Sequence, residues 1–148
     1  MRWIIATFVC ICLLCCAAGY YCWSVMPSAS VSRLLADEVH RGAGTVVDFS
    51  HVAPFAWDRV FVFHPYTPRT HIDACLGFPW DGSKWSEIES SDGVNLVVFV
   101  RDGAVVCWFD HSRRDGELVA LADPKGYTRE EAKFRVSLDQ EQRLVLSK

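Results

Sequence analysis

Behind Met1 and Arg2, the chain runs for 24 residues, Trp3 to Met26, without a charged side chain or a histidine. As a helix, such a stretch would be roughly 36 Å long, which exceeds the hydrocarbon core of about 30 Å in a typical bilayer. The basic residue Arg2 favours retention of the N-terminus in the cytoplasm. We therefore expect residues 1–26 to enter a membrane and the following chain to lie on its non-cytoplasmic side.

Three fates of this segment are compatible with its residues. A cleaved signal peptide would have residues 3–14 as its apolar region and small residues that permit cleavage after Ala18 or Gly19. The apolar run beyond Ala18 favours an uncleaved transmembrane anchor instead. A lipoprotein signal would place the lipid on Cys16, although Cys15 is not the glycine or alanine usual before a lipidated cysteine. All three fates export the rest of the chain.

The charge of the remaining chain argues against one class of partner. Without Arg2, 14 basic residues stand against 18 acidic residues, a net charge of −4. Nucleic-acid-binding proteins need a basic surface that displaces counterions from phosphates, and Arg113–Arg114 is the only adjacent basic pair. We therefore expect no nucleic-acid partner. The expected partners are the membrane, through residues 1–26, and an envelope protein or a glycan.

The distribution of cysteines also changes at the end of the apolar segment, near residue 26. Five of the seven cysteines lie in the apolar segment, where cysteine behaves as a small hydrophobic residue. Only Cys75 and Cys107 belong to the part behind it. An even pair in an exported domain is a candidate disulfide, which would close a loop of about 30 residues and contribute about 3–4 kcal/mol. The alternative is two buried free thiols.

Residues 27–43 are expected to link the membrane segment to a domain that spans residues 44–148. Within the linker, apolar residues recur at helical spacing, namely Val31, Leu34, Leu35 and Val39. This spacing indicates a short amphipathic helix, which Gly42 would end.

Six segments of the domain have the alternating or β-branched pattern of strands. They are residues 45–52, 58–63, 94–100, 104–109, 132–138 and 143–147. Asp102-Gly103, between the third and fourth segments, is the strongest hairpin signal, because a type I′ turn needs positive φ at both central residues. The last two segments predict a second hairpin.

One helix is expected between the second and third strands. Thr67 would be its N-cap, Pro68 its first residue and Gly77 the left-handed residue after its end. Together these elements predict an α+β fold, with a mostly antiparallel sheet of about six strands and one short helix covering one face.

Two groups of residues are candidates for a site. Trp80 and Trp85 lie in an irregular stretch after the helix, where exposed indoles would offer a stacking surface for a sugar ring or an anchor for a peptide. Alternatively, both rings complete the core. His71 and Cys75 are four residues apart and would share a helix face, but no second close pair completes the tetrahedral set of a zinc site.

Catalytic and cofactor motifs are absent from the sequence, including Gly-x-Ser-x-Gly and a glycine-rich phosphate loop. Cys75 lies on the apolar stripe of the expected helix, and burial there would raise the thiol pKa rather than activate it. We therefore expect a binding module without catalytic residues, metal or cofactor. The alternatives are a thiol- or metal-dependent enzyme using Cys75 and His71, and a purely structural accessory protein of the envelope.

The central part of the chain resembles small, N-terminally anchored bacterial envelope proteins of unknown function, among them candidate lipoproteins. The resemblance covers residues 55–109. It is carried by a Trp-Asp strand that runs into a Pro-Tyr-Thr turn (residues 57–67), a helix that ends in Leu76-Gly77, Ser91-Asp92-Gly93, and the hairpin at residues 98–106. It implies an envelope location and supplies no activity or site residues. The chain departs from the lipoprotein pattern before Cys16.

Overall fold

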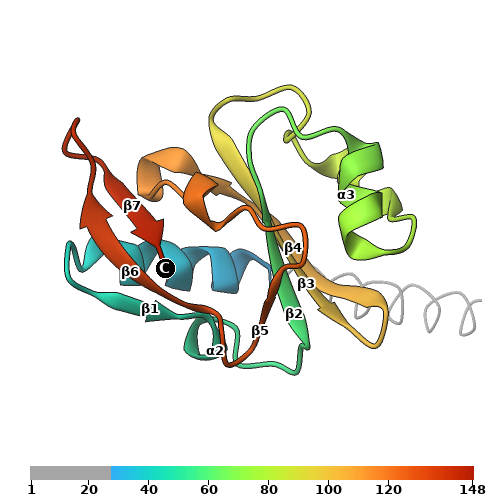
Figure 1. The fold of residues 1–148 in the computed structure, drawn as a ribbon, viewed down its shortest axis with the longest axis horizontal. Helices are drawn as coiled ribbons and strands as arrows, with labels where there is room; N and C mark the ends of the chain where they lie inside the picture. The colour runs from blue at the N-terminus through green and yellow to red at the C-terminus, as the bar shows by residue number, and fades with distance from the viewer. Residues whose placement is uncertain (1–27) are drawn as a thin grey trace, which may run out of the picture.

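The computed structural model describes residues 28–148 (Figure 1). This part of the chain has an α+β fold with seven β-strands in two antiparallel sheets and a few short helices. Within residues 28–148, no helix has the length and apolar character needed to span a bilayer. The membrane segment expected at residues 1–26, including the candidate lipidation site Cys16, lies outside the described residues.

The strands form one sheet of three and one of four. The smaller sheet has the order β1 (Val46–Asp48), β6 (Lys133–Leu138), β7 (Leu144–Ser147). The larger has the order β4 (Ala104–Ser112), β3 (Val94–Arg101), β2 (Arg59–Phe63), β5 (Tyr127–Thr128). All pairs within the sheets are antiparallel. A strand is present in each of the six expected segments, and the two-residue β5, too short to leave a sequence pattern, is additional. The expectation of a single sheet is wrong, because, of the seven strands, β1, β6 and β7 pair only with one another.

The helices are short. A helix at residues 28–40 precedes β1, and it is followed by α2 (Phe49–Val52) and α3 (Arg69–Leu76). Three single turns of 3₁₀ helix complete the set: η1 (Asp81–Trp85), η2 (Arg113–Asp115) and η3 (Val119–Leu121).

The β3–β4 hairpin confirms the strongest sequence prediction. Asp102 and Gly103 have φ angles of 50° and 73°, the left-handed pair that a type I′ turn requires. The Asp58 carboxylate accepts a hydrogen bond of 2.8 Å from the Asp102 backbone N–H, which ties the turn to the start of β2.

The strand expected at residues 45–52 is wrong in its second half. β1 ends at Asp48, whose carboxylate accepts a hydrogen bond of 2.9 Å from the Ser50 backbone N–H and so caps α2. This local hydrogen bond competes with the sheet. The turn of helix directs Phe49 and Val52 into the core, which continued β pairing would not do for both.

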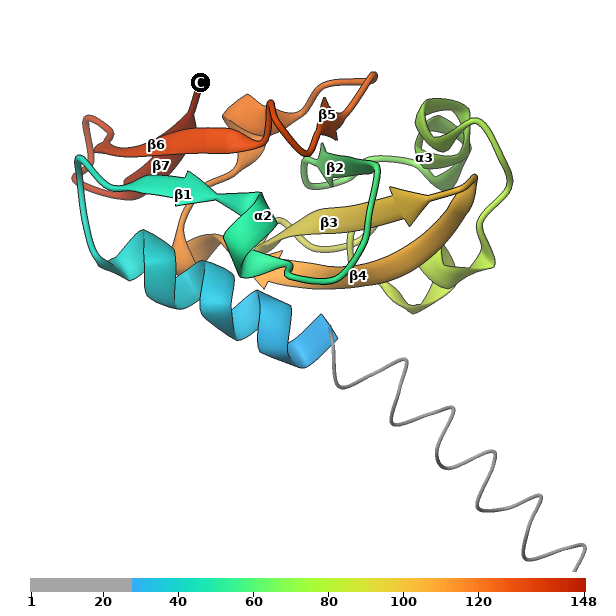
Figure 2. The ribbon, with the colours of Figure 1, turned by 90° about the horizontal axis from the view of Figure 1, so that it is seen from below.

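The linker expected at residues 27–43 is, from residue 28 onward, part of the packed domain. Val31, Leu35 and Val39 are buried along one face of the helix, and Leu34 is exposed. Figure 2 shows this helix beneath β1. The amphipathic pattern is confirmed, and Gly42, with φ of 96°, follows the helix as expected.

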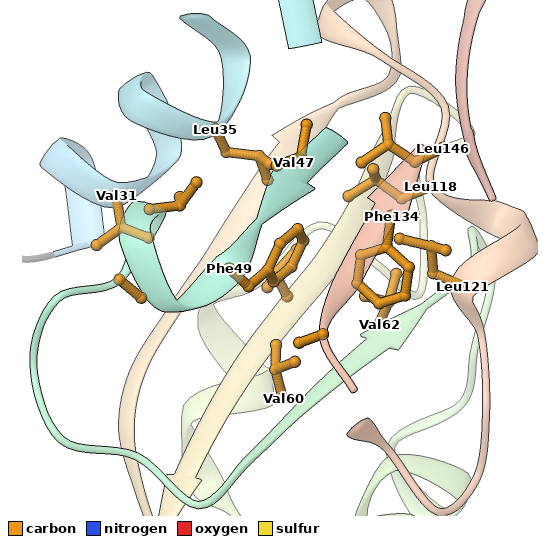
Figure 3. Packing of buried hydrophobic residues seen from close by; sticks show 14 of the residues in the cluster. Val31, Leu35, Val47, Phe49, Val60, Val62, Leu118, Leu121, Phe134 and Leu146 are labelled. Carbon is orange, nitrogen blue, oxygen red and sulfur yellow. The ribbon is translucent and has the colours of Figure 1, made fainter. Parts of the chain in front are cut away.

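The main core lies between the two sheets and includes side chains from the helix at residues 28–40 (Figure 3). Its labelled members in Figure 3 are Val31, Leu35, Val47, Phe49, Val60, Val62, Leu118, Leu121, Phe134 and Leu146. A second core on the opposite face of the larger sheet contains Phe61, Phe63, Ile72, Leu76, Ile88, Leu96, Val98 and Val100. The larger sheet is therefore covered on both faces, and the expectation of cover on one face is wrong.

The expected α3 is present with a different start. Thr67 is buried and its hydroxyl donates to the His64 carbonyl at 2.7 Å, so it does not cap the helix. The Glu89 carboxylate instead accepts from the first helical N–H, that of Arg69, at 2.9 Å. At the other end, Gly77 has φ of 81° and its N–H donates to the Asp73 carbonyl, as its left-handed position predicts.

Candidate functional site

A small pocket of about 120 Å³ lies beside α3 and contains the residues singled out for thiol or metal chemistry. His64 and Thr67 reach it from the end of β2, His71 and Cys75 from α3, and Asp123 from the segment after η3. We call this the thiol pocket. His71 and Cys75 share a helix face as predicted, and the sequence could not show that Asp123 joins them.

The thiol pocket brings a thiol and an imidazole together beside a carboxylate. The Cys75 Sγ and the His71 Nε2 are 3.5 Å apart. Burial raises the pKa of the Cys75 thiol, and the Asp123 carboxylate raises it further, because both disfavour the thiolate. Within residues 28–148, no group of three or more His, Cys, Asp or Glu side chains could hold a metal ion.

We expect Cys75 to be alkylated more slowly at pH 7 than the same cysteine in the urea-unfolded chain. Its raised pKa leaves less thiolate at this pH, and the ratio of the two rates should approach one only as the pH rises above the pKa of the thiol in both states. Iodoacetamide labelling followed by peptide-resolved mass spectrometry measures this rate apart from those of the other cysteines. Faster labelling of Cys75 in the folded chain than in the unfolded chain at pH 7 would contradict this expectation and support the thiol-dependent enzyme.

The disulfide considered for Cys75 and Cys107 is not formed. Both are free thiols, and they belong to different cores: Cys75 borders the second core and Cys107 lies in the main core. The larger sheet separates the two, so a bridge would have to pass through it. Cys107 is buried, its Sγ lies 3.6 Å from the Ser28 hydroxyl, and burial raises its thiol pKa.

The two candidate tryptophans have different environments. Trp80 is half-buried beside the second core, with its ring edge-to-face against Trp108 at a centroid distance of 5.5 Å. Its indole also covers Gly82, where an added Cβ would lie 2.4 Å from the ring. Trp85 is 82% exposed. Trp80 thus packs against Trp108 with part of its surface exposed, whereas the Trp85 ring is almost wholly exposed.

The turn that carries Trp85 is well tied to the domain. Ser83 is buried, and its hydroxyl donates to the Trp80 carbonyl at 3.0 Å. Lys84 forms an ion pair with Asp81 across the same turn. Ser86, next to Trp85, donates to the Asp110 carboxylate at 2.6 Å. The indole is thus exposed on a backbone that is held on both sides.

A second pocket, of about 550 Å³, was not expected from the sequence. We call it the arginine pocket, after Arg113, Arg114 and Arg143, which line it together with Glu117. The pair Arg113–Arg114 was the only sequence signal for it. Arg143 comes from the far end of the chain, and only the packing of β7 beside the segment after η2 brings it there.

The chain matches none of the protein-family models, curated proteins or solved structures with which it was compared. The case for a function therefore rests on the residues described above.

Proposed function

We propose that the chain is a membrane-tethered or exported envelope protein whose folded domain binds another protein through Trp85. The apolar segment at residues 1–26 supports the export of the domain. The observation that supports the binding role is the 82% exposure of the Trp85 indole, since the other tryptophans of residues 28–148 that the structure places, Trp57, Trp80 and Trp108, are buried or half-buried.

Exposure of an indole on a restrained turn favours binding. Tryptophan is enriched among the residues that dominate protein interfaces, where it fills a pocket of the partner. Because η1 is held by the Ser83 and Asp81–Lys84 contacts, little backbone freedom would be lost when Trp85 docks. Because Trp80 packs on Trp108, only the Trp85 ring protrudes. A single protruding indole suits insertion into a pocket of a partner protein, whereas stacking on a glycan would be favoured by two exposed indoles.

The thiol- or metal-dependent enzyme has less support. The Cys75 thiol has a raised pKa beside Asp123, and the thiol pocket of about 120 Å³ is well below the roughly 300–1,000 Å³ of typical small-molecule sites. We therefore assign the binding role to Trp85 and no catalytic role to Cys75 or His71.

Photo-crosslinking tests this proposal in the full-length chain in the envelope. With a photoreactive residue at the exposed position Glu87, whose side chain makes no contact that holds η1, we expect one discrete protein adduct. Trp85→Ala should reduce its yield at least about tenfold, as loss of a dominant interface residue does. The folded domain should keep its stability within about 0.5 kcal/mol, because the replaced ring is on the surface.

Leu138→Ala is the matched control, since Leu138 is a hydrophobic residue with 46% exposure on β6; it should leave the adduct unchanged. An adduct that survives Trp85→Ala, or one that contains glycan and no protein, would refute the binding role. A reporter fused after Lys148 that is active only inside the cell would refute the envelope location separately.

A further inference from the structure

The arginine pocket brings three guanidinium groups together on a chain that is acidic as a whole. Arg113 and Arg114 belong to η2 and Arg143 directly precedes β7, while Glu117 is the only acidic residue of the lining. Three guanidinium groups surround one concavity of a chain whose net charge is −3; Glu117 pairs with Arg113, Asp139 and Glu141 pair with Arg143, and Arg114 has no such partner among the described residues. The pocket volume of about 550 Å³ falls within the roughly 300–1,000 Å³ of small-molecule sites.

The walls of this pocket are joined by backbone hydrogen bonds. The Arg113 N–H donates to the Gly93 carbonyl at 3.0 Å, which ties η2 to the start of β3. The Glu117 N–H donates to the Leu144 carbonyl at 2.8 Å, and this ties the segment after η2 to β7. The segments that carry the three arginines are therefore placed before any ligand arrives, which lowers the entropy lost on binding.

The turn before Arg143 is also ordered. The Asp139 carboxylate accepts from the backbone N–H groups of Glu141 and Arg143 at 2.8 and 2.9 Å. The Arg143 Nε donates to the other oxygen of the same carboxylate at 2.8 Å, and its Nη1 lies 3.3 Å from Glu141. This leaves Nη2 of Arg143, whose side chain is 58% exposed, without a hydrogen bond to any described residue.

The three arginines differ in their free hydrogen-bonding capacity. Arg113 is engaged, because it pairs with Glu117 and its Nη1 donates to the Asp92 carbonyl at 2.6 Å. The exposed Arg114 side chain makes no hydrogen bond or ion pair with any residue in the range 28–148. A guanidinium has five N–H donors in a fixed fork that matches the oxygens of a carboxylate or phosphate. Arg114 and the free edge of Arg143 are therefore available to an anion.

We propose that the arginine pocket binds a small soluble ligand that carries phosphate or carboxylate groups. Oxygens of the ligand accept from Arg114 and Arg143, Arg113 remains held by Glu117 as part of the wall, and Leu144 provides apolar contact for the rest of the ligand. The proposal concerns residues remote in sequence from Trp85 and stands independently of the binding role assigned to that residue.

Calorimetric titration of the full chain in neutral detergent micelles tests the site, with inorganic pyrophosphate and citrate as separate probes at low ionic strength. We expect saturable binding of at least one probe. The double variant Arg114→Gln, Arg143→Gln should weaken it at least about tenfold, since it removes hydrogen bonds to a charged group. Higher salt should weaken it as well, because the pocket is open to solvent.

Arg33→Gln is the matched control: it makes the same change at an exposed arginine on the helix at residues 28–40, and binding should remain within about twofold of the parent. Three results would overturn the proposal. One is the absence of saturable binding for both probes. Another is equal weakening by Arg33→Gln and by the double variant, which would indicate unspecific electrostatic attraction. The third is a chain that binds neither soluble probe but associates, in a manner that depends on Arg114, with micelles containing phosphatidylglycerol. That result would assign the bound anion to a lipid headgroup.

Discussion

Gly126→Ala is expected to lower the free energy of unfolding by about 3 kcal/mol or more, through a strained backbone and a steric clash together. Gly126 has φ of +61°, and a Cβ there would lie 2.8 Å from the Val60 carbonyl oxygen and 2.9 Å from the Phe61 ring. Both neighbours belong to β2, the strand to which β5 pairs immediately after Gly126. Neither can move without disturbing the larger sheet. Urea denaturation followed by near-UV circular dichroism measures the loss.

The variant Gly103→Ala separates the two contributions expected for Gly126→Ala, namely backbone strain at positive φ and a steric clash of the added Cβ. Gly103 also has positive φ, +73°, but an added Cβ would meet nothing within 4 Å. Alanine there should cost only about 1–2 kcal/mol, the penalty of a left-handed conformation. Equal losses in the two variants would show that β2 yields to a Cβ at residue 126 and that close packing of the turn on this strand is unimportant.

Phe134→Ala is expected to lower the free energy of unfolding by about 3–5 kcal/mol, the usual range for a fully buried phenylalanine. Phe134 lies on β6 and is completely buried between the sheets. Its ring packs edge-to-face on Phe49 at a centroid distance of 5.2 Å and on Tyr127 at 4.9 Å. Its removal would leave a cavity where the smaller sheet meets β5 of the larger. This is a large part of the roughly 5–15 kcal/mol that stabilises a domain.

Leu138→Ala on the same strand is the control for this experiment, because Leu138 is 46% exposed and its truncation should change stability by about 0.5 kcal/mol or less. The urea midpoints of the two variants compare their stabilities directly, provided that their m-values agree. Similar stability of the two variants would contradict the packing of the smaller sheet on the larger through Phe134.

Local patterns in the sequence predicted most of the elements. The Asp102-Gly103 turn, the left-handed Gly77 and the buried stripe of Val31, Leu35 and Val39 depend on residues that are neighbours along the chain. Each could therefore be recognised from spacing and backbone preference alone. The errors arose where a local polar contact or a remote residue intervened: Asp48 caps α2 and ends β1, and Glu89 takes the place of Thr67 at the start of α3.

The candidate sites were predicted less well. Trp80 and Trp85 were expected to be either both exposed or both in the core. Trp80 instead packs against Trp108, a residue of β4 more than 20 positions later, while Trp85 is exposed. The pairing of two cysteines was considered because their number is even, and the position of the larger sheet between them could not be read from number or spacing. Asp123 in the thiol pocket had no sequence signal.

Short-range information thus sufficed for the hairpin, the helical stripes and the α+β class, because backbone conformation and hydrophobic period depend on adjacent residues. The long uncharged N-terminal stretch belongs to the same class of evidence. Long-range packing was needed to divide the strands between two sheets, to separate Cys75 from Cys107, and to gather Arg113, Arg114 and Arg143 at one pocket. These arrangements depend on contacts between residues far apart in the chain, for which a single sequence contains no local pattern.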